Sequence, residues 1–310
     1  MAIDVLCSGY VSMDHMIKID SSAKPGFTSI VTNKSNTHAF CGGCSVNIAY
    51  ALSRLGVEAA PVVRVGQDCE TCGFMDYMTE GNVCLDGVRV IEGENTSVSY
   101  LIQDANNDHI TCFYPGAMDE KYYESFDEEL FDGVKLGVIT VAPKKDNEDF
   151  FRICKKKNIP VCFGMKDDFT AFPHDFLKEI LLGAEIIFTN EVEREVIEKR
   201  YGWESICDVF ELGEARYIIT TLGAQGSLIH YKSQDRIVKV HVPACEIDEI
   251  VDATGGGDAY MAGFIYGWLK GESPERCAAL GSKLSWFVLQ DWGCTTNAPS
   301  EQQLLEQMGE

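Results

Sequence analysis

Short apolar runs alternate with stretches of helical periodicity through the second half of the chain, and this alternation constrains the fold most. Predicted strands cover residues 137–141, 159–163, 185–189, 217–221 and 227–230. Predicted helices cover residues 147–157, 176–182, 191–200 and 204–212. Strands separated by helices predict βαβ units and a mainly parallel sheet. Ligands of such sheets bind at the carboxyl ends of the strands.

Three consecutive glycines lie between two acidic residues in the segment Asp252-Ala253-Thr254-Gly255-Gly256-Gly257-Asp258. Apolar residues then recur at helical spacing, which predicts an amphipathic helix with one apolar face made of Met261, Phe264, Ile265, Trp268 and Leu269. The glycines would stand at the helix N-terminus, where free N–H groups attract an anion and a phosphate can approach the backbone closely. Asp258 could then take a proton from a hydroxyl that attacks phosphorus. A glycine turn with a capping Asp is the alternative, and spacing alone leaves both open.

The first half of the chain has a different pattern. Residues 3–7 predict a short strand, and a helix is predicted to open at Cys41-Gly42-Gly43-Cys44 and to end at Gly56. Between them, residues 16–40 alternate weakly and contain turn formers, which predicts short strands and loops. Residues 97–104 and 109–114 predict a hairpin.

Charge and composition limit the class of partner. The chain has 310 residues and a formal net charge of -22, with a pI near 4.6. Nucleic acids and anionic membranes need a basic surface, so neither is an expected partner. A phosphate ligand would have to be held by local amides and a cation.

The chain shows neither a secretory signal nor an apolar stretch long enough to span a bilayer. Its 13 cysteines are scattered and odd in number, which favours reduced thiols in the cytoplasm. Cys41 and Cys44, with Cys69 and Cys72, form two CxxC pairs that could suit a structural zinc site. Small buried thiols are the alternative.

Five segments together resemble the signature motifs of the ribokinase-like carbohydrate kinases, also called the PfkB family. In chain order they are 42–56, which contains Gly42-Gly43-Cys44-Ser45-Val46-Asn47, then Val65-Gly66-Gln67-Asp68, Asn190-Glu191-Val192-Glu193, Thr221-Leu222-Gly223-Ala224-Gln225-Gly226 and Asp252 to Asp258. They occur in the order of the family and cover nearly the whole chain.

The resemblance implies a fold and a reaction. The expected fold class is α/β, a three-layer α/β/α domain with a mainly parallel central sheet and a small β-sheet lid. Residues 1–310 would form a single kinase unit, with the lid at about 11–37 and 96–113 and the remainder as the core domain. The implied reaction is transfer of the ATP γ-phosphoryl group to a sugar hydroxymethyl group with Mg²⁺.

The resemblance also implies site residues. By similarity, Asp258 would be the general base, and the anion hole would consist of Gly255, Gly256 and Gly257. The acceptor hydroxyls would be held by Asp14, Gly42, Gly43 and Asn47. ATP would contact Asn190, Thr221, Gly223 and Gly226. Mg²⁺ and its waters would be organised by Asn190 and Glu193, since this ion keeps several waters and needs few protein oxygens. A monovalent cation such as K⁺ could bind carbonyls near Asp252 and Thr254, with Gly293 to Thr296 completing the loop.

The acceptor is suggested by the hairpin and the turn Pro115-Gly116-Ala117-Met118 that follows it. This segment resembles the nucleoside kinases of the family, especially adenosine kinases, which implies an adenosine-like acceptor whose base lies against apolar and aromatic groups. A free-sugar kinase for ribose or fructose is the alternative, and a non-catalytic nucleotide or sugar sensor is a third.

Two further expectations bear on the acceptor and on assembly. Such kinases often have an Asp-Pro-Gly-like turn after the strand at 159–163, but this chain has Gly164-Met165-Lys166-Asp167-Asp168. Asp167 or Asp168 is a candidate replacement for the acid of that turn.

Lid sheets of the family often pair between subunits, so a homodimer is compatible with the sequence, as is a monomer.

Overall fold

A computed structural model describes residues 2–106, 108–165, 168, 170–234 and 236–309. Within these residues the main body is built on a nine-stranded sheet in the order β13-β12-β11-β10-β9-β8-β1-β4-β5. The strands are β1 (Val5–Ser8), β4 (Ala59–Gly66), β5 (Val88–Ile91), β8 (Leu136–Ile139), β9 (Val161–Gly164), β10 (Ile186–Asn190), β11 (Tyr217–Thr221), β12 (Ser227–Ser233) and β13 (Arg236–Val242). Neighbours from β5 to β11 pair in parallel, and only β12 and β13 are antiparallel. The mainly parallel sheet predicted from the sequence is therefore confirmed.

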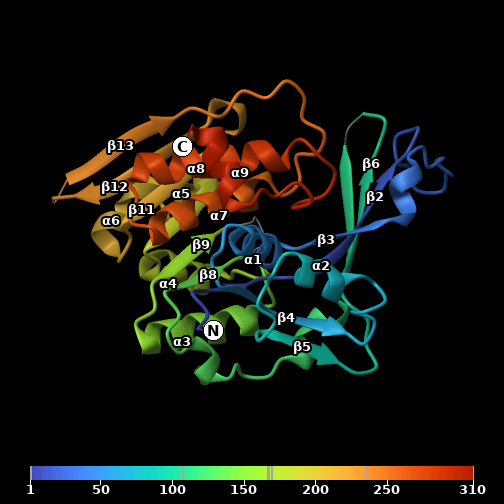
Figure 1. The fold of residues 1–310 in the computed structure, drawn as a ribbon, viewed down its shortest axis with the longest axis horizontal. Helices are drawn as coiled ribbons and strands as arrows, with labels where there is room; N and C mark the ends of the chain where they lie inside the picture. The colour runs from blue at the N-terminus through green and yellow to red at the C-terminus, as the bar shows by residue number, and fades with distance from the viewer. Residues whose placement is uncertain (1, 107, 166–167, 169, 235, 310) are drawn as a thin grey trace.

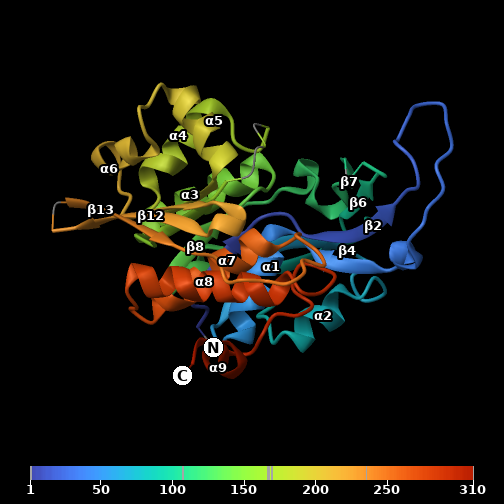
Figure 2. The ribbon, with the colours of Figure 1, turned by 90° about the horizontal axis from the view of Figure 1, so that it is seen from above.

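Helices cover both faces of this sheet and complete three layers (Figure 2). They are α1 (Cys44–Arg54), α2 (Phe74–Glu80), α3 (Lys144–Lys157), α4 (His174–Gly183), α5 (Glu191–Tyr201), α6 (Val209–Leu212), α7 (Gly256–Leu269), α8 (Pro274–Val288) and α9 (Glu301–Met308). The predicted helix at 204–212 is confirmed in part: Ser205 accepts the Cys207 N–H and caps a 3₁₀ helix at Ile206–Asp208, which continues directly into α6 from Val209. No helix in the described residues is both long and apolar enough to cross a bilayer.

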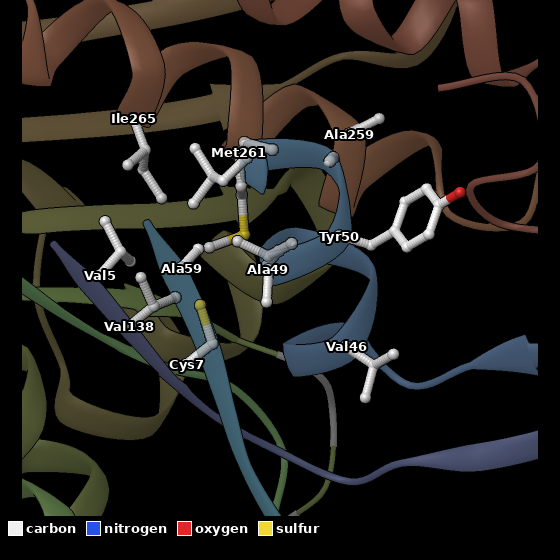
Figure 3. Packing of buried hydrophobic residues seen from close by; sticks show 14 of the residues in the cluster. Val5, Cys7, Val46, Ala49, Tyr50, Ala59, Val138, Ala259, Met261 and Ile265 are labelled. Atoms are coloured by element: carbon white, nitrogen blue, oxygen red, sulfur yellow. The ribbon is translucent and has the colours of Figure 1, made fainter. Parts of the chain in front are cut away.

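Two apolar clusters lie on the two faces of the sheet. Val5 and Cys7 of β1 belong to the cluster beneath α1, α7 and α8, whereas Leu6 between them belongs to the cluster beneath α3 and α4. This division follows from the two-residue side-chain period of a strand. Figure 3 shows the first cluster, where Val138 of β8 faces side chains of α1 and α7.

The helix α7 departs from its predicted one-sided pattern. Every residue from 259 to 267 is buried, because α7 packs against the sheet and against both α1 and α8. Gly263 permits the approach to α8, since a Cβ on it would lie 2.6 Å from the Leu280 carbonyl oxygen. The interpretation of this helix as amphipathic is therefore wrong. Small residues outside the predicted apolar face, such as Gly263, are the points at which a neighbouring helix packs against α7.

A second sheet stands at the end of the molecule away from β13 (Figure 1). Its order is β3-β2-β6-β7, with strands β2 (Ser12–Lys18), β3 (Ala39–Gly42), β6 (Val98–Gln103) and β7 (His109–Tyr114). The predicted hairpin is confirmed as the antiparallel pair of β6 and β7. Strand β3 lies beyond the predicted 11–37 range. The register puts Asp14, Phe40, Ser99 and Phe113 on one face of this small sheet.

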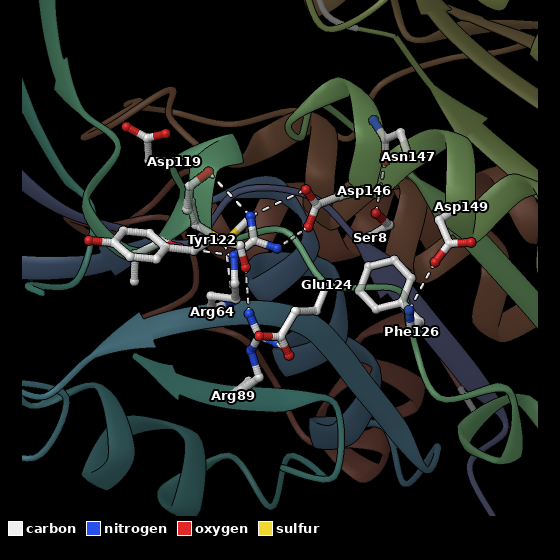
Figure 4. A network of polar contacts seen from close by, with 12 residues as sticks. Ser8, Arg64, Arg89, Asp119, Tyr122, Glu124, Phe126, Asp146, Asn147 and Asp149 are labelled. Atoms are coloured by element: carbon white, nitrogen blue, oxygen red, sulfur yellow. Dashed lines mark hydrogen bonds and ion pairs between the residues drawn. The ribbon is translucent and has the colours of Figure 1, made fainter. Parts of the chain in front are cut away.

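A buried ion pair joins the main sheet to the turn that leaves the small sheet (Figure 4). Arg64 of β4 contacts both carboxylate oxygens of Asp146 in α3, and its Nε donates to the Ala117 carbonyl oxygen at 2.9 Å. Burial raises the pKa of Asp146, and the Arg64 charge opposes that rise. The pair therefore fixes the chain at 116–118 with respect to the core.

Candidate active site

The glycine run stands at the start of a helix, as its sequence predicts. Gly255 takes the left-handed conformation at φ +81° and precedes α7, so the first turn of the helix contains Gly256, Gly257 and Asp258. A Cβ on Gly255 would lie 2.6 Å from the Cys294 carbonyl oxygen, so a side chain is excluded both by space and by backbone conformation. The Gly256 N–H makes a long contact of 3.4 Å with the Ala253 carbonyl oxygen, which an anion could displace. The other N–H groups in the first turn of a helix have no intrahelical partner and suit an anion.

A cavity of about 180 Å³ opens beside this turn. Its walls come from the carboxyl ends of neighbouring strands of the main sheet and from the first turns of α1 and α7. The lining residues are Cys44, Thr140, Gly164, Met165, Phe188, Thr189, Asn190, Glu193, Thr221, Gly257, Asp258 and Met261. Five residues predicted for phosphoryl transfer are thus brought together at the sheet edge where ligands of parallel sheets bind, namely Asn190, Glu193, Thr221, Gly257 and Asp258.

Asn190 and Glu193 are held by each other. The Asn190 Oδ1 accepts the Glu193 backbone N–H at 2.8 Å, and the Glu193 Oε2 accepts the Asn190 backbone N–H at 2.8 Å. This capping box opens α5 and fixes both side chains at the cavity wall. Carboxylate and amide oxygens at this point suit Mg²⁺, which is bound through few protein oxygens and several waters.

The residues predicted to hold the acceptor are not among those that line this cavity, but one of them contacts Asp258. Asn47 of α1 donates from Nδ2 to the Asp258 Oδ2 at 2.7 Å. Asp14 of β2 is buried, accepts the Ser12 hydroxyl, and lies so close to Gly42 that a Cβ there would meet its Oδ2. Gly43, at φ +99°, allows the backbone to approach the Tyr10 carbonyl.

Three carboxylates surround the loop after α8. Burial raises the pKa of the Cys294 thiol well above its usual range, and Asp14, Asp258 and Asp252 raise it further. Asp252 accepts the Thr254 N–H through Oδ1 at 2.9 Å and the Gly293 N–H through Oδ2 at 3.1 Å. The two segments predicted to form a cation loop are therefore adjacent.

Other predicted residues lie apart from the cavity wall. Gly223 begins a tight turn after β11, and Gly226 follows that turn at φ +93°, close against the Val242 carbonyl. Asp168 accepts the Thr170 and Ala171 N–H groups, which gives it a local turn role. Asp167 lies outside the described residues.

The two CxxC pairs form no evident metal site. Among the described residues, no group of three or more His, Cys, Asp or Glu side chains could hold a metal ion.

Sequence reasoning missed several wall residues. Thr140 donates to the Ser8 carbonyl oxygen at 2.8 Å and fixes the ends of β8 and β1 next to each other. Thr140 is a polar residue inside the otherwise apolar predicted strand at 137–141, and this exception to the apolar pattern could have marked it as a site residue. Met165 and Met261 carried no such signal, because an apolar residue at a strand or helix position indicates core.

The fold is of the α/β class with a cavity at the carboxyl ends of its strands, and comparison with known proteins gives the family. The model of the pfkB family carbohydrate kinases matches residues 2–301, so the chain belongs to that family. It is accordingly a kinase that acts on an alcohol group.

Several nucleoside kinases are similar to this chain in sequence and in structure. A nucleoside kinase of Methanocaldococcus jannaschii is 28% identical over 98% of this chain and 96% of its own length. The crystal structure of the nucleoside kinase of that organism superposes with a TM-score of 0.86 at 25% identity, over 100% of this chain and 98% of that one. A Burkholderia thailandensis nucleoside kinase in complex with inosine has a TM-score of 0.86 at 22% identity, over 98% and 97% of the two chains.

Proposed function

We propose that this protein is an ATP-dependent nucleoside kinase that transfers the γ-phosphoryl group to the ribose hydroxymethyl group of an adenosine-like nucleoside. One observation carries the proposal: Asp258 and the glycine run open α7 in a cavity shared with Asn190, Glu193 and Thr221. Phosphoryl transfer needs a base, a turn that binds an anion and a site for a metal ion, and the proposal assigns these roles to Asp258, the glycine run and the pair Asn190 and Glu193.

The chemical step follows from these positions. The hydroxyl oxygen of the acceptor attacks the γ-phosphorus, the bond to the β,γ-bridging oxygen breaks, and ADP leaves. The hydroxyl proton passes to the Asp258 carboxylate, and the N–H groups of Gly256 and Gly257 bind the negative charge on the transferred group. Gly255 provides the left-handed turn that aims these N–H groups.

The proposed binding sites for Mg²⁺ and for ATP lie at and just after the ends of strands of the main sheet. Asn190 and Glu193 would hold Mg²⁺ through its waters, and the ion would neutralise charge on the phosphates. Thr221 lies at the end of β11, with Gly223 and Gly226 in the next turn, so the nucleotide would extend from the cavity over this turn. The loop that Asp252 ties to Gly293, with Thr254, is the proposed monovalent cation site.

The small sheet supports a neutral acceptor with a flat base. On its Asp14 face the described side chains include one lysine, Lys18, and no arginine, and the Lys18 ammonium lies 4.7 Å from the centre of the Trp292 ring. A phosphorylated acceptor would need a cation there. The same face carries Phe113, whose ring meets Tyr10 edge-on at 5.1 Å, and such rings can cover a purine.

Assembly through the small sheet is part of the proposal. Tyr100 and Ile110 are 43% and 44% exposed. Both lie on the face opposite Asp14, where a second copy could cover them. Light scattering of the wild-type protein should then give twice the mass of one chain. The double variant Tyr100→Glu with Ile110→Glu should give the mass of one chain. A wild-type protein that is monomeric at micromolar concentration would contradict the proposed dimer.

The experiment measures ADP release with Mg-ATP against a panel of nucleosides and free sugars. Turnover with adenosine or inosine supports the proposal, and turnover only with ribose or fructose identifies a free-sugar kinase. ATP binding without turnover on any acceptor supports a sensor. In the active case, Asp258→Asn should lower turnover by on the order of 10²–10⁴ while ATP binding stays nearly intact. Near-normal turnover of that variant would refute the base.

A further inference from the structure

The hydrogen bond between Asn47 and Asp258 joins residues that are 211 positions apart. It is 2.7 Å long and links the first turns of α1 and α7, which pack against each other. The Asn47 side chain is 2% exposed, whereas Asp258 lines the cavity. The amide thus approaches the carboxylate from the protein interior, behind the surface that a substrate would meet.

The remaining atom of the Asn47 amide has no such contact. Its Oδ1 is buried and has no hydrogen-bond partner in the described part of the chain. A buried amide oxygen without a partner is costly, so a residue with a purely structural role is expected to satisfy it. The donated bond to Asp258 is therefore the feature that accounts for an amide at this position.

Only one orientation of the amide is compatible with a carboxylate at 2.7 Å. Reversing the amide would bring its oxygen against a carboxylate oxygen, and neither would have a proton to share. Hence Nδ2 faces the Asp258 Oδ2, and this carboxylate oxygen is occupied. The other oxygen, Oδ1, is the better proton acceptor, because its lone pairs are not drawn into the amide hydrogen bond.

We propose that Asn47 is a positioning residue that fixes the rotation of the Asp258 carboxylate and assigns proton acceptance to Oδ1. The inference rests on the proposed function, since it takes Asp258 as the base. In the transfer step the acceptor O–H bond breaks toward Asp258 Oδ1 as the new O–P bond forms and ADP departs. Asn47 acts through Asp258 in this scheme, whereas the sequence motif assigns it to the acceptor hydroxyls.

The two roles differ in their kinetics. A residue that orients the base affects the chemical step and lowers kcat, whereas a residue that only binds the acceptor raises KM. Loss of a hydrogen bond to a charged group corresponds to roughly a 10- to 100-fold change. We expect Asn47→Leu, which keeps the branched shape and the number of side-chain heavy atoms, and Asn47→Ser to lower kcat by about that factor, with KM for the nucleoside changed less than about threefold.

A double-mutant cycle gives the decisive test. Asn47→Leu is measured alone and together with Asp258→Asn, with saturating Mg-ATP and the nucleoside that the wild-type enzyme turns over. If Asn47 acts through the base, its substitution should have almost no further effect once the base is gone. Ser53→Ala is the control, because Ser53 is a buried polar residue at the far end of the same helix. Its kcat should match that of the wild type.

The outcomes separate the inference from the function on which it rests. Losses in kcat that do not add to those of Asp258→Asn support the positioning role. Thermal melts and ATP binding of the two Asn47 variants serve as the folding control, and both should match those of the wild type. A raised KM with unchanged kcat, or losses that add fully to those of Asp258→Asn, overturns the positioning role while the kinase stands. Near-normal turnover of Asp258→Asn overturns both the base and the inference.

Discussion

The buried pair of Arg64 and Asp146 gives a quantitative prediction about stability. Their side chains are 5% and 4% exposed, so removal of one partner leaves a charge with almost no access to water. Arg64 would keep its bonds to the Ala117 and Met118 carbonyl oxygens, which carry no full charge. Breaking a buried pair in this way costs about 3–5 kcal/mol.

That cost converts into a large shift of the melting temperature. Each kcal/mol shifts Tm by about 2–4 °C in chains somewhat smaller than this one, so Asp146→Ala should lower Tm by roughly 6–20 °C. Urea denaturation should give the same ranking of free energies of unfolding. Asp132→Ala is the matched control, because Asp132 pairs with Lys157 at the surface and its side chain is 69% exposed. Exposed pairs contribute about 0–1 kcal/mol.

A paired variant tests the cause of the loss. Arg64→Met combined with Asp146→Leu removes both charges and should recover most of the stability, because apolar groups can replace a buried ion pair at little cost. The reasoning would be refuted if Asp146→Ala melted no lower than Asp132→Ala. It would equally fail if the double variant were as unstable as the sum of its single changes.

Three further predictions concern the site. Asp14→Ala should raise KM for the acceptor with the ATP affinity retained, measured by steady-state kinetics, and an unchanged KM would exclude its acceptor-holding role. Glu193→Gln should raise the Mg²⁺ concentration needed for half-maximal rate while Tm stays near wild type, since Gln also completes a capping box; an unaltered Mg²⁺ titration counts against the metal role. Asp252→Ala releases the Gly293 N–H, so it should abolish any stimulation by K⁺ over Na⁺, and a K⁺ response that survives would contradict the proposed cation loop.

Local pattern carries much of the fold. The strands of the parallel sheet were predictable because short apolar runs alternate with helices, and the start of α7 was predictable because three glycines precede a helical period. Motif order gave the family as well, because each motif is contiguous in the chain. These features depend on neighbours within a few residues, which a sequence displays directly.

Tertiary structure decided the rest. The burial of residues 259–267 in α7 depends on packing against α1 and α8, and α8 approaches closely at Gly263 and Gly267. Strand β3 joins the small sheet by pairing with β2 across an intervening loop, which no local period marks. The contact of Asn47 with Asp258, and that of Arg64 with Asp146, each join distant segments.

The sequence by itself therefore determined the α/β class, the motif residues and the start of α7 at the glycine run. Only the tertiary structure decided which atom of Asn47 faces which oxygen of Asp258, and which charge neutralises Arg64. The physical reason is that hydrogen bonds and ion pairs depend on distances of a few ångströms between side chains. Such distances are set when whole elements pack, and the order of residues in the chain does not encode them locally.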